Sequence, residues 1–197
     1  MAVADLLSGP ILLYKAPVAE ATPDTLIAAG AAWAGNWVNW GYTMAPLTAA
    51  YTFEELDYKV EQELTPVERV KTSEALTLET VLAEITAAKL AVATSGTATS
   101  TAAAAGVEAH DELTVGGENV LDKYQWGFEG TYVDASGTRW PVRMYVWKGT
   151  QSILSAQEYS TTSMVGIPIQ IKALVDTTKS VGQKLFKWER VTAAATA

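Results

Sequence analysis

The stretch DKYQWGFEGTYVDASGTRWPVRMYVWKG, residues 122–149, predicts two amphipathic strands joined by a turn. Apolar side chains recur at every second position in both runs, which is the period of a β-strand. The segment 134–137 between the runs has the composition of a tight turn. One parity of this hairpin is expected to face a core; its members are Tyr124, Trp126, Phe128 and Tyr132, followed by Trp140, Val142, Met144 and Val146.

The opposite parity of the second run mixes arginine with aromatic side chains, namely Arg139, Arg143, Tyr145 and Trp147. Arginine and aromatic residues together are typical of protein interfaces, so this face is predicted to contact another subunit. A single-stranded nucleic-acid surface would use the same residue types. The formal net charge of −8 disfavours that alternative, because binding to phosphates requires an excess of Lys and Arg.

The remaining sequence predicts further strands and one helix. Residues 9–17 predict a first strand, and residues 51–71 predict a half-exposed strand that returns after Pro66. From Val81 onward apolar residues recur at helical spacing, which predicts a helix over about 81–93.

A late apolar strand is predicted within residues 163–176, where Ile167, Ile169 and Ile171 share one parity. Pro168 lacks an N–H group, which favours an edge strand or pairing on only one side at that point. An edge strand is free to pair with a neighbouring copy, so these three isoleucines are predicted subunit contacts.

The predicted fold is mainly β: a β-sandwich or barrel with one flanking helix, formed by a single domain over residues 1–197. Segment 18–50 is loop-rich, and segment 95–106 is predicted to be a low-complexity loop of Ala, Thr, Ser and Gly. The chain has no Cys, so it has no disulfide framework, and its first residues make a poor secretory signal.

Charge is distributed unevenly along the chain. Residues 1–119 hold 5 basic and 16 acidic residues, a net of −11, whereas residues 120–197 hold 9 basic and 6 acidic residues, a net of +3. Two solvated faces would explain this pattern, and so would head-to-tail contact between copies.

The sequence offers little that indicates catalysis. His110 is the only histidine; metal binding with Asp111 and Glu112 is conceivable, but an exposed histidine near a strand start is the expected case. The acidic residues of 54–68 could supply a carboxylate pair for glycoside hydrolysis or a calcium site, but the calcium-loop pattern is missing. We therefore expect no enzyme activity, no cofactor and no metal.

Read in order, four segments resemble the major tail tube proteins of long-tailed, siphophage-like bacteriophages. They are TPDTLIAAGAAWAGNWVNWGYT, YTFEELDYKVEQELTPVERVKT, LTLETVLAEITAAKLAVAT, and a last third that runs from KYQWGFEG through WPVRMYVWKG and VGIPIQIKALVD to KLFKW. The resemblance extends over about three quarters of the chain, and its motifs are patterns of strand and turn.

The resemblance implies a structural virion protein, made in the host cytoplasm and located in the virion tail. Such subunits form hexameric rings that stack into a hollow tube, through which DNA is ejected into the host without specific binding. The implied partners are further copies of the chain, a tape-measure protein, and tail terminator and distal tail proteins. The bore is usually acidic, and the candidates to line it here are Glu54, Glu55, Asp57, Glu61 and Glu63.

Three alternatives fit parts of the same sequence. One is another ring-forming tube protein or a tail terminator on the same scaffold. A second is a Trp-rich carbohydrate-binding β-sandwich, which would show a flat exposed row of aromatic side chains. A third is a β-sandwich hydrolase that uses acids of the 54–68 cluster, for which the sequence provides no partner base.

Overall fold

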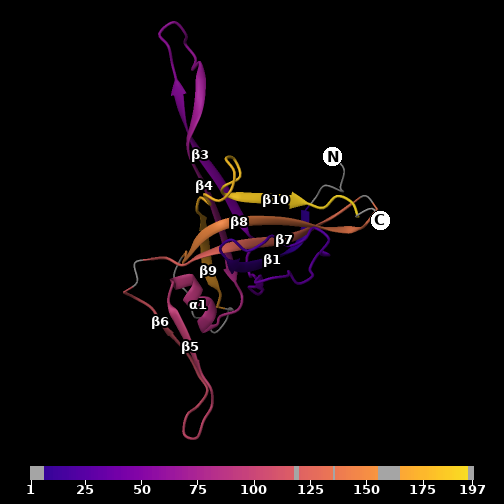
Figure 1. The fold of residues 1–197 in the computed structure, drawn as a ribbon, viewed down its shortest axis with the longest axis vertical. Coiled ribbons are helices and arrows are strands. Elements are labelled where there is room, and N and C mark those ends of the chain that lie inside the picture. The colour runs from indigo at the N-terminus through magenta and orange to yellow at the C-terminus, as the bar shows by residue number, and fades with distance from the viewer. Residues whose placement is uncertain (1–6, 118–119, 135, 155–164, 195–197) are drawn as a thin grey trace.

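The computed structural model describes residues 7–117, 120–134, 136–154 and 165–194. The chain is mainly β with one short helix, as predicted (Figure 1). The elements are β1 Leu7–Pro17, β2 Val38–Asn39, β3 Thr48–Tyr58, β4 Glu68–Leu82, α1 Ala87–Thr94, β5 Thr97–Thr101, β6 His110–Thr114, β7 Lys123–Val133, β8 Arg139–Ile153, β9 Ile167–Ala173 and β10 Phe186–Arg190.

One large antiparallel sheet has the strand order β2-β1-β7-β8-β9-β4-β3, and β10 also pairs with β8. The long strand β8 supports two neighbours along the same side, since residues 142–146 pair with β10 and residues 149–153 pair with β9. Strands β5 and β6 form a separate two-stranded sheet. The predicted hairpin is therefore confirmed as β7 and β8, and it lies at the centre of the large sheet.

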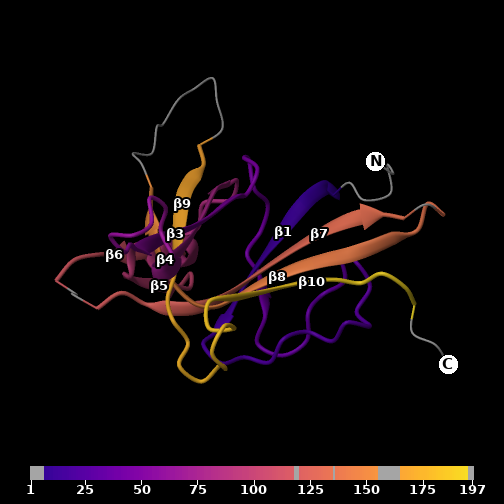
Figure 2. The same cartoon turned by 90° about the horizontal axis from the view of Figure 1, so that it is seen from above.

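The sheet bends so that its two halves share one core. Strands β3, β4 and β9 run across the direction of β1, β7, β8 and β10 (Figures 1 and 2). Leu78 and Ile169 from the first half pack in the same cluster as Trp126, Phe128 and Val146 from the second. The predicted core parity of the hairpin is confirmed at these three residues, and the shared core is consistent with a sandwich.

A second core lies on the opposite face of β1, β7 and β8. It forms because part of the loop-rich segment 18–50 folds back over that face and brings Trp33 and Trp37 against it. Trp33 stacks on Tyr14 of β1 with a centroid distance of 4.0 Å and an interplanar angle of 9°. Stacked and edge-to-face aromatic pairs add to the stabilisation that burial alone provides. Strand β8 is consequently buried on both faces.

The second core requires a glycine where Trp33 meets the sheet. A Cβ on Gly127 would lie 2.2 Å from Trp33 Cζ3 and 2.9 Å from Trp37 Cζ3. We expect Gly127→Ala to lower the free energy of unfolding by about 1–3 kcal/mol, the usual cost of overpacking. Gly130→Ala, on the same strand, is the control, since its Cβ would meet only Ile11 Cγ1, at 4.0 Å. Urea denaturation followed by tryptophan fluorescence measures both variants, and equal losses would contradict the packing account.

The helix begins later than its predicted range of 81–93. Strand β4 continues to Leu82, because Leu76, Leu78 and Leu82 alternate toward the core and are fully or almost fully buried. The helix starts after Thr86, whose side chain accepts a hydrogen bond from the backbone N–H of Lys89 at 3.2 Å. That contact is a regular N-cap, and it sets the start of α1.

Two other predictions need correction. Segment 95–106 is not only a loop, since residues 97–101 form β5 and pair with β6; β-branched threonines favour a strand. Strand β9 is not at an edge, because it lies between β8 and β4. Pro168 is opposite Val81 of β4, and on the β8 side its carbonyl accepts a hydrogen bond from the backbone N–H of Leu154 at 2.9 Å. The missing N–H therefore removes one donor at that residue and does not place the strand at an edge.

Candidate functional site

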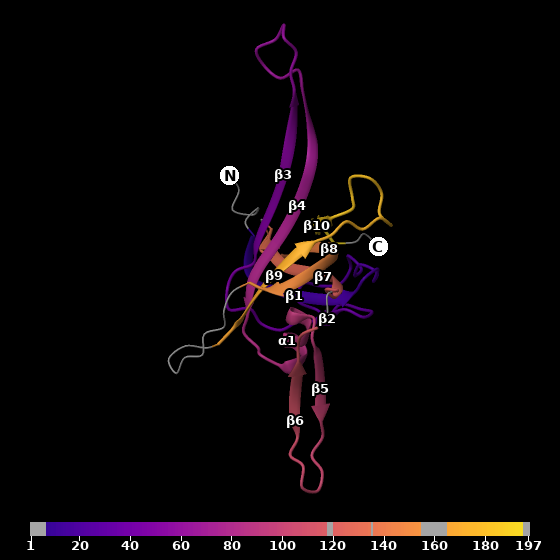
Figure 3. The same cartoon turned by 90° about the vertical axis from the view of Figure 1, so that its left-hand side faces the viewer.

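Two hairpins project from the body in opposite directions (Figures 1 and 3). The first, here called the acidic arm, comprises residues 48–75 of β3, β4 and their connection. Each of its residues is exposed except the half-buried Pro66. The second, here called the threonine arm, comprises residues 97–114 of β5, β6 and their connection. Neither arm has a packing partner along most of its length among the described residues, so both are candidate contact surfaces.

One face of the acidic arm carries an ion-paired network. Arg69 Nε lies 3.0 Å from a carboxylate oxygen of Asp57, and Lys71 Nζ lies 3.0 Å from Glu74. The hydroxyl of Tyr51 donates to Glu74 at 2.8 Å. Hydrogen bonds from Lys71 and Tyr51 hold the pKa of Glu74 below its usual range. Exposed pairs of this kind add little stability, so their main effect is to order the side chains of this face.

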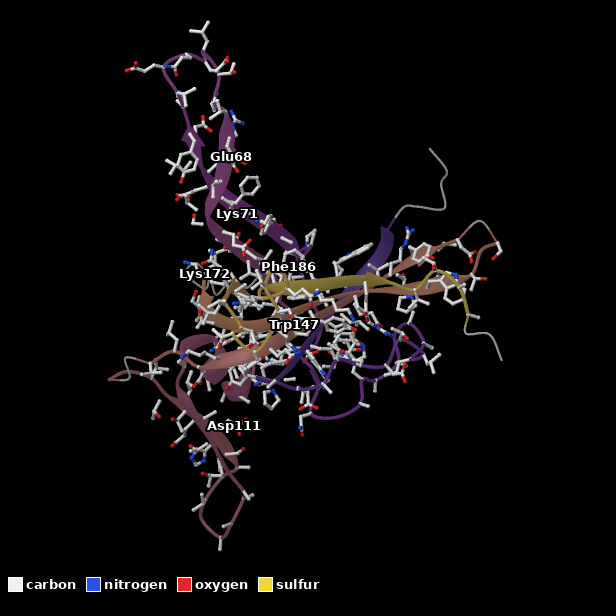
Figure 4. The ribbon with its side chains drawn as sticks, turned by 45° about the horizontal axis from the view of Figure 1, so that its top comes forward. Glu68, Lys71, Asp111, Trp147, Lys172 and Phe186 are labelled. Atoms are coloured by element: carbon white, nitrogen blue, oxygen red, sulfur yellow. The ribbon has the colours of Figure 1, made fainter. Side chains whose placement is uncertain are left out.

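The five acids predicted to line a bore all lie on the acidic arm, and Figure 4 shows Glu68 and Lys71 along the same hairpin. Glu55 and Asp57 are on the face of Arg69, and strand alternation places Glu54 on the other face. Glu61 and Glu63 belong to the connection at the tip. The arm holds 7 acidic and 3 basic residues, a net charge of −4. The structure thus brings these acids together on one exposed element, and their place in a bore stays a prediction.

The outer end of the acidic arm is also apolar. Leu56 pairs directly with Val70, and the connection carries further large apolar side chains. The exposed fractions range from 40% for Val70 to 103% for Leu64. We call this set the apolar tip; it consists of Leu56, Tyr58, Val60, Leu64, Val67 and Val70. Large exposed apolar side chains gathered on one projecting element are typical of a protein contact site.

Among the described residues, no strand pairs with the outer edge of β3. It is the last strand in the order of the large sheet, and all of its residues are exposed. A long open edge readily pairs with another chain, and proteins that remain monomeric usually cover or shorten such an edge. The acidic arm therefore combines three features of a contact surface: charge, apolar area and an open strand edge.

The predicted subunit interface on β8 and β9 is wrong for six of its seven residues. Arg143, Tyr145 and Trp147 lie in or against the second core, and the isoleucines of β9 lie in the first, so no neighbour can reach them. The exposed fraction is at most 8% for each; the six are Arg143, Tyr145, Trp147, Ile167, Ile169 and Ile171. Arg139 is exposed beside the β7–β8 turn, and its assignment stays a prediction.

Sequence reasoning missed the buried ion pair between Glu129 and Arg143. Each side chain is 1% exposed, and Arg143 Nε donates to Glu129 Oε2 at 2.7 Å. Glu129 also accepts from the backbone N–H of Gly30 at 2.6 Å and from Trp33 Nε1 at 3.1 Å. The pair therefore attaches the part of segment 18–50 that covers the sheet, here called the covering loop, to strands β7 and β8.

The guanidinium of Arg143 makes two further contacts with the same loop. Its Nη1 donates to the carbonyl of Asp24 at 3.1 Å, and its Nη2 donates to the carbonyl of Ile27 at 2.6 Å. The neighbouring Tyr145 donates to Glu189 at 2.8 Å, and burial together with this hydrogen bond raises the pKa of its hydroxyl. These hydrogen-bonded side chains therefore hold parts of the same subunit together.

Asp134 organises the β7–β8 turn and makes it sensitive to acid. Its carboxylate accepts from the Ser136 hydroxyl at 2.6 Å, from Trp140 Nε1 at 2.7 Å and from the Thr138 N–H at 2.9 Å. The hydrogen bonds from Ser136 and Trp140, with those from the backbone, lower the pKa of Asp134 from 3.8 to about 2.

We expect Asp134→Asn to destabilise the fold at neutral pH and to matter less in acid. A folded-state pKa below the unfolded value means that the carboxylate stabilises the fold above the unfolded pKa. That contribution is lost as pH falls from 3.8 toward about 2. Thermal unfolding of both proteins at neutral pH and near the lower limit of this window measures the difference. A difference of the same size at both pH values would contradict the assigned role.

The threonine arm holds the residues considered for metal binding. His110 Nε2 lies 3.3 Å from Glu112, while Asp111 points to the other face and accepts a hydrogen bond from Ser100. Within the described residues, no group of three or more His, Asp or Glu side chains is arranged to hold a metal ion.

The one helix in the described part of the chain, α1, has eight residues and is too short to cross a membrane.

No protein-family model matches the chain, and no curated protein matches it either.

Proposed function

We propose that this chain is a structural subunit of a phage tail, in which hexameric rings stack into a hollow tube that conducts DNA. The observation that carries the proposal is the acidic arm, an exposed hairpin with an apolar tip and an open strand edge. A monomer gains nothing from keeping this surface in water, whereas a subunit that contacts its own copies would bury it.

The placement of the arms supports growth along an axis. The two arms point in opposite directions and differ in sequence, so a contact made by one arm cannot be repeated by the other. Contacts between unlike surfaces form rings when the rotation closes and filaments when it does not. A tube of stacked rings uses both kinds of contact. The order of the four segments that resemble tail tube proteins favours this arrangement.

The charge of the acidic arm supports a role in conducting DNA. Carboxylates do not replace the counterions of DNA, so a bore lined by the arm would not retain the polymer. A sixfold ring would repeat the net charge of −4 in every subunit. Passage of DNA, and assembly with tape-measure, terminator and distal tail proteins in the virion, belong to this proposal.

The bore assignment predicts a gain of DNA binding when the charge is reversed at the tip. Glu61→Lys with Glu63→Lys is the best choice, because neither side chain takes part in the ion pairs of the arm. We expect labelled DNA to sediment with tubes of this variant and not with wild-type tubes. Glu108→Lys on the threonine arm, outside the proposed bore, is the control. Equal binding by both variants would contradict a bore lined by the tip.

The carbohydrate-binding alternative is weakened by the burial of the tryptophans. Five of the seven have exposed fractions of 8% or less, namely Trp33, Trp37, Trp40, Trp126 and Trp147. Trp140 is half-buried, and Trp188 is exposed. A glycan platform needs several exposed aromatic rings in a row, and these side chains form core layers instead.

The test is negative-stain electron microscopy across a concentration series of the purified protein, with light scattering to follow particle size. Hollow tubes of uniform width are the expected result. Single rings that never lengthen would favour the terminator alternative. A chain that stays monomeric at every concentration would contradict the proposal.

A further inference from the structure

Five aromatic rings of the second core, here called the aromatic cluster, form a continuous chain of contacts. Tyr145 lies at its centre, with its ring centroid 5.5 Å from that of Trp33 and 6.2 Å from that of Trp37. Trp147, labelled in Figure 4, adds a ring 6.5 Å from Tyr145, and Tyr14 stacks on Trp33. Aromatic rings this close can pass an electron from one to the next, so the cluster can be oxidised as a unit.

Tyr145 differs from the other four rings in the group that accepts its proton. A phenol that loses an electron becomes strongly acidic, so oxidation is easiest where a base already accepts its hydrogen bond. The Tyr145 hydroxyl donates to Glu189 Oε1 at 2.8 Å, while Lys187 pairs with the other oxygen, Oε2. Because Tyr145 is fully buried, this carboxylate and not the solvent is placed to receive the proton. Burial also raises the pKa of the hydroxyl, so the proton stays on the oxygen until the electron leaves.

Among the described residues, the other four rings donate their polar hydrogen to weaker or committed acceptors. The hydroxyl of Tyr14 and the indole N–H groups of two tryptophans donate to backbone carbonyls, which are weak bases. Trp33 Nε1 donates to Glu129, but protonation of that carboxylate would leave Arg143 as a buried cation without its counter-charge. Tyr145 is therefore the ring of the aromatic cluster at which oxidation can release a proton to a carboxylate.

Two lysines favour a neutral radical over a charged one. Lys179 Nζ lies 4.1 Å from the ring centroid of Trp147, and Lys187 Nζ lies 5.8 Å from that of Tyr145. A cation over an aromatic face is attracted by the π electrons, so it opposes removal of an electron from that ring. A tyrosyl radical that has released its proton carries no charge, and the lysines do not oppose it. The favoured product of oxidation is therefore the neutral radical of Tyr145.

We propose that Tyr145 is a site of one-electron oxidation, in which proton transfer to Glu189 accompanies loss of the electron. A radical oxidant takes one electron from Trp147, which has the largest exposed fraction of the five rings, 8%. Tyr145 then gives an electron to Trp147, its O–H bond breaks, and the proton bonds to Glu189 Oε1. The products are the reduced oxidant, a neutral tyrosyl radical and a protonated Glu189, so electrons, protons and charge balance.

Such a site confines oxidative damage within one molecule. A radical on an exposed tyrosine, such as Tyr42 with an exposed fraction of 74%, can couple to a tyrosine of another molecule. The ring of Tyr145 cannot meet a second molecule, because it is fully buried. This activity does not depend on the proposed tail function.

A tethered photo-oxidant tests the transfer directly, since the chain has no Cys and a single one can be introduced. Gln183→Cys carries a thiol-reactive ruthenium polypyridyl complex at an exposed position, where the backbone carbonyl accepts from Trp147 Nε1 at 2.8 Å. A laser flash with hexaammineruthenium(III) as quencher leaves the tethered complex as a one-electron oxidant. All samples also carry Tyr51→Phe, because Tyr51 borders the same loop and donates to the Glu74 carboxylate. Transient absorption distinguishes tyrosyl from tryptophanyl radicals.

The labelled protein is expected to form a tyrosyl radical, and to form it more slowly in heavy water than in ordinary water. Tyr145→Phe should remove the tyrosyl signal and leave a tryptophanyl signal. Glu189→Gln keeps a hydrogen-bond acceptor but removes the base, so it should lower the tyrosyl yield severalfold. Tyr132→Phe removes a buried tyrosine outside the aromatic cluster and should behave like the labelled parent.

Three outcomes would overturn the inference. They are a parent protein that forms no tyrosyl radical, a tyrosyl signal that persists in Tyr145→Phe, and a Glu189→Gln protein whose tyrosyl yield and isotope effect equal those of the parent. Circular dichroism checks the fold of each variant. If Tyr145→Phe does not fold, the comparison of Glu189→Gln with the parent decides the question.

Discussion

A chain with a shortened acidic arm is expected to remain folded and monomeric under the conditions in which the proposed assembly of the full chain is observed. The cut follows the register: Glu54 and Ser73 are opposite one another, so residues 55–72 can be replaced by Asn-Gly. Two residues of this type close an antiparallel hairpin in the favoured turn. The deletion removes the apolar tip and most of the acidic residues. The body should keep its stability, since the removed residues make almost no buried contacts.

A companion variant separates the chemistry of the tip from the length of the arm. Leu64→Ser with Val67→Ser keeps the hairpin and removes two of its most exposed apolar side chains. Full burial of such a side chain is worth about 1.5–3 kcal/mol. Each 1.4 kcal/mol is a factor of about ten in affinity, so the threshold concentration for assembly should rise by at least about tenfold. Light scattering measures the threshold and thermal unfolding checks the fold. Normal assembly of the shortened chain would exclude the acidic arm as a contact.

Arg143→Met is expected to cost about 3–5 kcal/mol of stability, the usual result of removing one partner of a buried ion pair. The substitution leaves the Glu129 carboxylate buried without its cation. It also removes the donors that serve the carbonyl groups of Asp24 and Ile27. The covering loop should detach first, so quenching of tryptophan fluorescence should precede loss of the sheet signal in circular dichroism.

Two controls define the cause of that loss. Arg143→Met combined with Glu129→Gln should recover part of the stability, because no uncompensated charge is then buried. Arg69→Met removes a cation that pairs with Asp57 on the acidic arm, where the two side chains are 62% and 37% exposed. An exposed pair is worth at most about 1 kcal/mol, so this variant should stay close to wild type. Similar losses for Arg143→Met and Arg69→Met in urea denaturation would show that the buried pair has no special role.

The sequence was sufficient to predict the β7–β8 hairpin because two periodic runs flank a recognisable turn. Its inner parity was correct at Trp126, Phe128 and Val146. The side chains of the outer parity were predicted to contact a neighbouring subunit, whereas the covering loop of the same chain packs on them. Arginine and aromatic side chains are common both at subunit interfaces and in a core that contains a buried ion pair. Composition alone therefore could not distinguish an interface from such a core.

A register argument would have found the ion pair. Once Val133 is opposite Arg139 across the turn, Glu129 must be opposite Arg143. An acid and an arginine facing each other among tryptophans and tyrosines indicate a buried pair. The two tryptophans of the loop, Trp33 and Trp37, were the second signal, because large aromatic side chains in an irregular segment need a surface to cover.

The start of the helix could not be placed because two periodicities overlap. Leu82, Ile85 and Leu90 fit a helical stripe, while Leu76, Leu78 and Leu82 fit a strand. Pairing with β9, which is distant in sequence, decides between them in favour of the strand as far as Leu82. Tertiary pairing of this kind lies outside any local window of sequence.

The strand order of the large sheet also determines when the molecule can fold during synthesis. Strand β1 pairs with β7, and β4 pairs with β9, so each waits for a partner that the ribosome makes much later. Among the described strands, the β3–β4, β5–β6 and β7–β8 hairpins can form from neighbouring sequence through short connections. The β1–β2 and β8–β9 pairs also join consecutive strands, but through longer connections. A topology dominated by distant pairings folds slowly and leaves strand edges exposed in the meantime. The nascent chain therefore carries a complete, highly charged hairpin while the core of the body is still incomplete.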